Sequence, residues 1–273
     1  MILIEECPRV SSLKQYVDRY QVFVIEEPAF LKTIPNAKIE CYLVKKGGFA
    51  EWDTALQSFV MYPRSGILPA TNQTSLYRIP ATLICLNIKF NLDILAFPLF
   101  SNLLTHWKDF DIADVIPEKE QKNVLSRITR EDPAIDVEKL DAVIAHALSN
   151  QPIDKKLNKL VKLMQDQIAN KLKVVDLANS LHMSQKSTER WIRKQFNLTP
   201  KKLLQVIRFE HVSRKLKNHP NKKLIDSLEF GYYDQSHFIK ECQKITGYAP
   251  KDLFYKMKLP TNDIIFEKFA NKS

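Results

Sequence analysis

Residues 231–238 have the sequence GYYDQSHF, and residues 246–250 have the sequence TGYAP. Asp234 can cap a helix that follows it, because its carboxylate can accept a hydrogen bond from a free backbone N–H of the first turn. Gly247 can end the same helix in the left-handed conformation. The apolar residues between them recur at helical spacing: Phe238, Cys242 and Ile245. The two stretches therefore predict a tight turn followed by a helix over residues 234–246.

The same arrangement occurs once before in the chain. A short helix is predicted over residues 174–181, and Ser184 can cap a longer helix after the turn at residues 181–184. In the later copy, the short helix is expected over residues 224–230. The inward face of the first longer helix consists of Thr188, Trp191, Ile192 and Phe196. Its outward face consists of Gln185, Lys186, Glu189, Arg190 and Arg193.

One long helix is predicted between the two copies. Thr199 can cap it, Pro200 suits its first turn, and residues 218–221 stop it. At ~1.5 Å per residue, its roughly 18 residues span about 27 Å. Two helix-turn-helix units held apart by a rigid helix can reach successive major-groove segments of DNA, about 34 Å apart. An earlier apolar stripe predicts one more helix: Leu157, Leu160, Val161, Met164 and Ile168.

The positive charge of the chain is concentrated in this helical part. Residues 151–258 contain 23 lysines and arginines against 10 acidic residues, a net charge of +13. Residues 1–150 contain 16 against 19, a net charge of −3, and residues 259–273 are neutral. This asymmetry predicts that only the second part meets a polyanion, although charge alone does not separate DNA from RNA or an anionic membrane.

The first part of the chain has a different pattern. Short strands are expected over residues 22–25, 39–44, 59–61, 75–79 and 81–90, and a helical pattern follows from residue 92 to 148. This predicts two domains and a tail: a mixed α+β domain over residues 1–150, an all-α domain over 151–258 and a tail over 259–273. The α+β domain is expected to be a small antiparallel sheet or a barrel followed by helices.

At the motifs quoted above, the chain resembles the AraC/XylS family of transcription regulators. The resemblance covers about 105 residues, and the first unit contributes residues 176–178, 183–184, 189–190 and 198–202. It implies seven helices, with the long fourth one as linker, and sequence-specific binding of double-stranded DNA. Two positions depart from the family pattern: Thr188 replaces the usual leucine and Cys242 the usual phenylalanine. Both are expected to face inward, so packing there should be lighter.

The first part is similar, more weakly, to a sensor-like domain found on some members of the family. This implies a cupin-like or related β-domain. We expect this domain to sense a small-molecule effector or a partner, or to mediate formation of a homodimer, for which residues 137–148 are the candidate helix. The resemblance to the family implies action on RNA polymerase as an activator. Aromatic residues of this part either line an effector pocket or belong to the core: Tyr16, Tyr20, Phe23, Tyr42, Trp52 and Phe59.

On the first outward helix, the resemblance assigns base contacts to Lys186, Glu189 and Arg190. Arginine can bind guanine O6 and N7 together, and glutamate can accept from cytosine N4. Two interpretations stay open for Glu189, because it can instead pair with Arg193 one helical turn further on. Arg190 can likewise brace the fold, contact DNA, or do both.

On the second helix, the corresponding set is Gln235, Ser236, His237 and Lys240. Gln235 can read adenine, but a phosphate contact is expected, because most hydrogen bonds between proteins and DNA go to the backbone. These residues can also serve the turn itself. Phosphate contacts that weaken with salt are expected from lysines near helix starts: Lys201, Lys202, Lys222 and Lys223.

The alternative to a regulator is an enzyme, such as a repair or modification protein, with an appended DNA-binding domain. It would need a nucleophile or a metal site in residues 1–150, and the four cysteines are far apart and lack activating neighbours. We therefore expect no catalytic residue, metal or cofactor. A third interpretation is an interaction protein that has lost DNA binding. With no secretory signal and no membrane-length apolar run, a cytoplasmic protein is expected.

Overall fold

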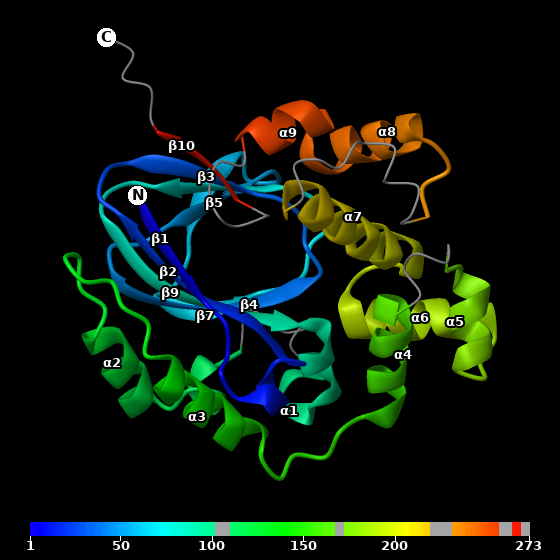
Figure 1. Cartoon of the computed structure of the whole chain (residues 1–273), viewed down its shortest axis with the longest axis horizontal. Helices are drawn as coiled ribbons and strands as arrows, with labels where there is room; N and C mark the ends of the chain where they lie inside the picture. Colours follow the sequence, from blue (N-terminus) through cyan, green and yellow to red (C-terminus); the bar gives the residue numbers. More distant parts are fainter. Residues whose placement is uncertain (102–109, 167–171, 219–230, 257–263, 269–273) are drawn as a thin grey trace.

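The computed structural model describes residues 1–101, 110–166, 172–218, 231–256 and 264–268. A strand-rich part with helices against one side is followed by a helical part (Figure 1). This confirms the predicted mixed α+β part and all-α part. Among the described residues, no helix is long and apolar enough to cross a membrane.

Two five-stranded antiparallel sheets face each other and enclose a barrel-like interior (Figure 1). The strand order of the first sheet is β1 (Ile2–Glu6), β2 (Val17–Ile25), β9 (Leu83–Asn91), β4 (Lys38–Lys46) and β7 (Ser65–Leu68). The strand order of the second sheet is β10 (Ile264–Lys268), β3 (Ala29–Thr33), β8 (Ser75–Ile79), β5 (Ala50–Asp53) and β6 (Ser58–Met61). Of the two alternatives for this part, the barrel describes the architecture better than a single small sheet.

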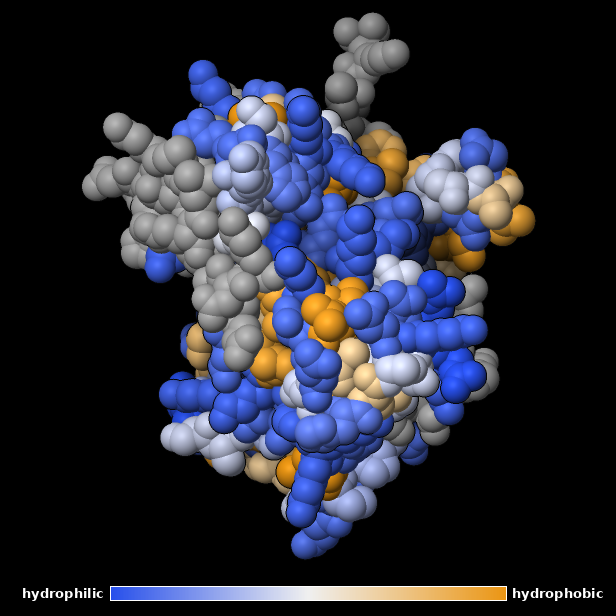
Figure 2. Space-filling model, turned by 90° about the vertical axis from the view of Figure 1, so that its right-hand side faces the viewer, coloured by the Kyte–Doolittle hydropathy of each residue, from blue (hydrophilic) through white to orange (hydrophobic). Residues whose placement is uncertain are grey.

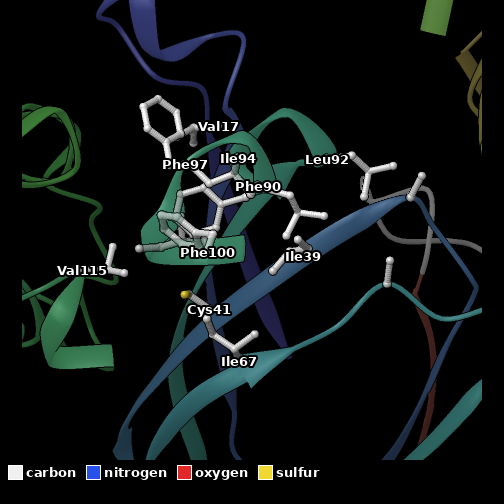
Figure 3. Packing of buried hydrophobic residues seen from close by; sticks show 14 of the residues in the cluster. Val17, Ile39, Cys41, Ile67, Phe90, Leu92, Ile94, Phe97, Phe100 and Val115 are labelled. Atoms are coloured by element: carbon white, nitrogen blue, oxygen red, sulfur yellow. The ribbon is translucent and has the colours of Figure 1, made fainter. Parts of the chain in front are cut away.

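Both faces of the first sheet are buried. Successive side chains of a strand point to opposite faces. In β4, Cys41 and Leu43 join an outer core against the helices that follow β9, whereas Tyr42 and Val44 join the core inside the barrel. Figure 3 shows Cys41 on the same side of the sheet as Phe100. A one-residue register slip would exchange the two sets, so the register is strongly specified.

The outer face of this sheet is covered by short helices. After η1 (Ser11–Leu13) near the N-terminus, they are η2 (Leu92–Ala96), α1 (Pro98–Ser101), η4 (Ile112–Asp114), α2 (Glu118–Ser126) and α3 (Val137–Leu148). Helix α3 turns its apolar side inward, with Leu140 and Ile144 buried. Its buried Asp141 accepts hydrogen bonds from the Tyr20 hydroxyl (2.6 Å) and from the backbone N–H groups of Arg9 and Val10 (2.8 Å each). These bonds fix α3 on the sheet.

The helical part follows the predicted order. It consists of α4 (Lys155–Asp166), α5 (Val174–Ser180), α6 (Gln185–Phe196), α7 (Pro200–Asn218), α8 (Gln235–Thr246) and α9 (Pro250–Lys256). The predicted stripe of α4 is buried at Leu157, Leu160, Val161 and Met164. Ile168 and the predicted short helix over residues 224–230 lie outside the described residues. The long helix α7 lies between the two helix-turn-helix units (Figure 1).

The two parts of the chain share their cores. The outer core runs without interruption from the first sheet through α4 and the first helix-turn-helix unit to Ile207 of α7. A separate cluster, which we call the distal core, contains Phe209, Phe238 and Cys242 from the helical part together with Ile34 and Ile265. Residues 264–268, within the segment predicted as a tail, form β10, which pairs with β3.

Candidate nucleic-acid interface

The first helix-turn-helix unit is stabilised by local hydrogen bonds at each helix start. The Asp176 carboxylate accepts a hydrogen bond from the backbone N–H of Lys173 (2.8 Å) at the start of α5. Ser184 caps α6 as predicted, since its hydroxyl accepts from the backbone N–H of Ser187 (3.2 Å). His182 in the turn has φ 53°, in the left-handed region. The turn therefore sets the direction in which α6 leaves α5.

Helix α6 has the predicted two faces. Thr188, Ile192 and Phe196 are buried, whereas Trp191 is only half-buried, with the Lys156 ammonium 4.6 Å from its ring centre. The side chains of the outward face are exposed, and none of them has a hydrogen bond or ion pair within the described part of the chain: Gln185, Lys186, Glu189, Arg190 and Arg193. The alternative in which Glu189 pairs with Arg193 therefore has no support in this geometry.

The second unit begins at Gly231, whose φ of 83° allows the tight turn. Asp234 caps α8 as predicted, accepting from the backbone N–H of His237 at 2.7 Å. Gly247 ends α8 with φ 79°, and its N–H donates to the carbonyl of Gln243 (2.8 Å). Tyr232 is buried and donates its hydroxyl hydrogen bond to Glu241 at 2.5 Å. Burial, helped by Glu241, raises the pKa of Tyr232, so this donor stays protonated.

The outward residues of α8 fall into two groups. Gln235, Ser236 and Lys240 are exposed, and their side chains have no hydrogen bond or ion pair among the described residues. His237 is also exposed, but its ring packs against Tyr232 at 5.2 Å between centres, and its Nε2 lies 3.9 Å from a Glu241 oxygen. The geometry thus leaves three of the four predicted residues free for a ligand and gives His237 contacts within the turn.

Tyr233 is a candidate that the sequence analysis did not select. Its side chain is 82% exposed, beside the start of α8, while its neighbour Tyr232 is 1% exposed. The sequence shows two adjacent tyrosines and gives no local signal of which one faces solvent. Alternation around the turn, with Tyr232 filling the space beside Phe238, decides it.

Lys201 and Lys202 are exposed at the start of α7, and the backbone N–H of Lys202 donates to the Thr199 hydroxyl (3.3 Å). Lys222 and Lys223 lie outside the described residues. Figure 2 shows the side of the molecule where α5, α6 and α7 are seen at the right of Figure 1; its coloured surface is largely hydrophilic, with smaller hydrophobic areas. A hydrophilic surface rich in unpaired basic side chains is what a phosphate backbone would meet.

Cysteines and metal-binding side chains are the residues that an enzyme in this chain would need. Cys41, Cys85 and Cys242 are buried and Cys7 is exposed, all of them as free thiols. Burial raises the pKa of Cys242 to about 12, so its sulfur stays protonated. Within the described ranges, no group of three or more His, Cys, Asp or Glu side chains is arranged to hold a metal ion.

Comparison with known proteins agrees with this geometry. A protein-family model described as a helix-turn-helix domain matches residues 177–255. Among curated protein sequences, none matches this chain. Two solved structures of ToxT are similar in fold. ToxT from Vibrio cholerae strain SCE256 with a bound unsaturated fatty acid has 13% identity and a TM-score of 0.51, over 86% of this chain and 94% of that one.

ToxT from Vibrio cholerae O395 has 14% identity and a TM-score of 0.52, over 89% of this chain and 98% of that one. The likeness extends over both parts of the molecule and concerns their fold. Together with the capped turns and the exposed helix faces, the family match identifies residues 177–255 as a helix-turn-helix domain, and these residues include the motifs that resemble the AraC/XylS family.

Proposed function

We propose that the protein binds double-stranded DNA sequence-specifically through α6 and α8, and that its first 150 residues control this binding. One observation carries the DNA-contact proposal: two capped helices, separated by α7, each present polar or basic side chains that have no partner among the described residues. Such side chains need no rearrangement of the protein before they contact a nucleic acid. The domain limits at residues 150 and 258 are part of this proposal.

Different roles follow from the chemistry of the exposed side chains. On α6, Arg190 reads a guanine, while Lys186 and Glu189 read neighbouring bases. On α8, Gln235 and Ser236 approach the DNA with Lys240. Phosphate contacts are assigned to Arg193, Lys201, Lys202 and the hydroxyl of Tyr233. His237 acts mainly through the turn, because it already contacts Tyr232 and lies near Glu241.

For the first part, we propose control by a small molecule bound in the barrel. A structurally similar ToxT was solved with an unsaturated fatty acid, and the present barrel also contains cavities between its sheets. Activation through RNA polymerase follows the family resemblance. A homodimer stays a prediction, and α3 would contribute to it only with its outward side, since its apolar stripe already packs on the first sheet.

The test is selection of the full-length protein on random double-stranded DNA, followed by affinity measurements at two salt concentrations. A bipartite motif with halves about 10 base pairs apart is expected. Arg190→Ala should lower affinity for the selected sequence about 10- to 100-fold, as expected for loss of a base contact. Lys201→Ala should weaken selected and random DNA alike and reduce the salt dependence.

Lys122→Ala is the matched control, because Lys122 is an exposed lysine on α2, away from both units. Enrichment of a single half-site would mean that only one unit reads bases. Failure to enrich any sequence would overturn the proposal and favour an interaction protein that has lost DNA binding. An enzyme with an appended DNA-binding domain gains no support from the family match or from the similar structures.

A further inference from the structure

We propose that the barrel binds a ligand with an ammonium-type cationic head and an apolar or aromatic body, in a cavity between the edge strands β6 and β7. This proposal rests on the proposed control by an effector and names the chemical class of that effector. We call this space the edge cavity. Its volume is 480 Å³, which is within the range of small-molecule sites.

The walls of the edge cavity come from both sheets. Strands β4 and β7 of the first sheet contribute Tyr42, Gly66 and Ile67, and strands β5 and β6 of the second sheet contribute Glu51 and Met61, among others. Gly66 keeps the wall open, because a Cβ there would come within 2.7 Å of the Tyr42 hydroxyl oxygen. The cavity is thus built where the two sheets meet without hydrogen bonding to each other.

The charged groups on this wall are acidic. Glu51 and Asp53 line the cavity, and the described lining residues include no lysine, arginine or histidine. Glu51 accepts a hydrogen bond from the Tyr62 hydroxyl, which fixes the direction of its carboxylate. A cavity with two carboxylates and no cation in its described lining favours a positively charged ligand.

Aromatic rings supply the second part of the recognition. Tyr42, Trp52, Tyr62 and Phe110 line the edge cavity. Tyr62 is held in place by Phe49, whose ring stacks on it at 5.3 Å, and lies 6.0 Å from the Tyr42 ring. A cation over an aromatic face is attracted by the negative face of the ring, and more strongly when the cation is removed from water. Rings and carboxylates together are the side chains that alkylammonium groups select.

A smaller cavity deeper in the barrel points to the same class of ligand. It measures 70 Å³, shares Tyr42 with the edge cavity, and is lined by Phe23, Leu83 and Cys85 with Glu40 and Asn87 at its polar side. Asn87 is 5% exposed, and its Oδ1 has no hydrogen-bond donor among the described residues. Its Nδ2 donates to Glu40 at 2.6 Å, so the free atom is an acceptor. Glu40 is paired with the buried Lys89 ammonium (3.3 Å), so the free polar atom at this cavity is the Asn87 Oδ1, which can accept a hydrogen bond from an ammonium group but not from a carboxylate.

The experiment is isothermal titration of the full-length protein with three probes that share one body and differ in the head group: 2-phenylethylamine, 2-phenylethanol and 3-phenylpropionate. The amine should bind at least about tenfold more tightly than the alcohol, and the carboxylate should bind most weakly. Glu51→Gln should reduce the preference for the amine to less than about threefold. This variant keeps the oxygen that accepts from Tyr62, so the fold should persist, which the Tm checks.

Glu131→Gln removes one negative charge at an exposed position of the same part and should leave all three affinities unchanged. Asp53→Asn provides a second variant if Glu51→Gln does not fold. Equal affinities for the three probes, or an amine preference that survives both substitutions, would overturn the proposal. Binding of the carboxylate alone would also overturn the cationic class, while leaving control by an effector intact.

A separate arm measures DNA affinity with and without the amine. Tight amine binding that leaves DNA affinity unchanged would retain the site and reject its role as an effector site. No binding of any probe would overturn the inference, and the DNA selection described above would still decide the DNA-binding proposal by itself.

Discussion

The first and second helix-turn-helix units are built alike but belong to different cores. In both, a polar residue caps the longer helix and the outward face carries free polar side chains. The apolar face of α6 joins the outer core, which continues through α4 into the first sheet. The apolar face of α8 joins the distal core, which contains Ile34 of the barrel part and Ile265 of β10. The same motif can therefore be fixed by a large continuous core or by a small one completed from a distant segment.

The largest losses of stability should come from removing one large side chain from each core. Phe196 at the end of α6 and Phe238 in the first turn of α8 are both fully buried, and Phe→Ala at such sites costs about 3–5 kcal/mol. Hydrogen exchange is expected to separate the two variants. Phe196→Ala should speed exchange in α4 and in the first sheet as well as in α6, because one core spans them, whereas Phe238→Ala should speed it mainly in α8 and α9. Identical exchange patterns would contradict the division into two cores.

The linker helix between the units is held to the barrel part by buried charges. The Lys38 ammonium lies 3.2 Å from Asp18 and 3.4 Å from Glu210 of α7, and the Ala37 N–H donates to Glu210 (3.1 Å). Burial by itself would raise the pKa values of both carboxyl groups, but Lys38 and neighbouring arginines bring them below their ordinary values. Their stabilisation is therefore present above about pH 4 and is lost as the pH falls further.

Lys38→Met should cost about 3 kcal/mol at pH 7, because two buried carboxylates lose their shared cation. The deficit relative to wild type should shrink at pH 3, where protonation removes the repulsion between them. Chemical denaturation at both pH values measures this. Arg9→Met is the matched control, since its pair with Glu138 is exposed and should contribute less than about 0.5 kcal/mol. A deficit that does not change with pH would mean that Lys38 acts through packing alone.

Two adjacent residues of β10 belong to different cores, so the barrel interior and the distal core can be compared within one strand. Ile264 is 4% exposed and belongs to the barrel interior, while Ile265 is 1% exposed and belongs to the distal core. Each Ile→Ala change should cost about 2–3 kcal/mol. Ile265→Ala should increase hydrogen exchange in α8, and Ile264→Ala should increase it in β3 and β8. If both variants loosen the same elements, β10 does not connect two cores.

The sequence predicted what depends on local signals. The caps at Ser184 and Asp234, the turn at Gly231 and the inward faces of α6 and α8 follow from residue type and spacing, and the structure confirms them. Strands near β2, β4, β6, β8 and β9 were predicted as well. Strands β1, β3, β5, β7 and β10 were not predicted. Strand β10 has five residues that form a strand through pairing with β3, more than 200 residues earlier.

The ion pairs of Lys38 could not be predicted either, because they join residues that are far apart in the sequence. The periodicity of α7 predicts which of its faces is buried, but it does not predict that Glu210 contacts Lys38 at the start of β4. In α6 and α8, the sequence identified which side chains face outward. Which of them keep contacts within the protein, as His237 does with Tyr232, depends on the packed turn. Contacts with DNA stay a prediction for all ten selected residues.

The smallest expected effects come from two threonines, one in each longer helix. Thr188 and Thr246 are both 0% exposed. The Thr188 hydroxyl, at a position where the family usually has leucine, has no hydrogen-bond partner among the described residues. The Thr246 hydroxyl donates to the Cys242 carbonyl (2.7 Å) and accepts from the backbone N–H of Tyr248 (3.0 Å). The Thr188 hydroxyl therefore destabilises the fold, because it is buried without a hydrogen bond, whereas the Thr246 hydroxyl pairs backbone groups at the end of α8.

Replacing each threonine with valine keeps its shape and removes only the hydroxyl. Thr188→Val should raise the free energy of unfolding by about 1 kcal/mol, because a buried polar group without a partner disappears. Thr246→Val should lower it by about 1–2 kcal/mol, because the Tyr248 N–H is left unpaired. Thermal and chemical denaturation of the two variants give the sign directly. Destabilisation by Thr188→Val would contradict this account, because it would mean that the Thr188 hydroxyl has a hydrogen-bond partner in solution.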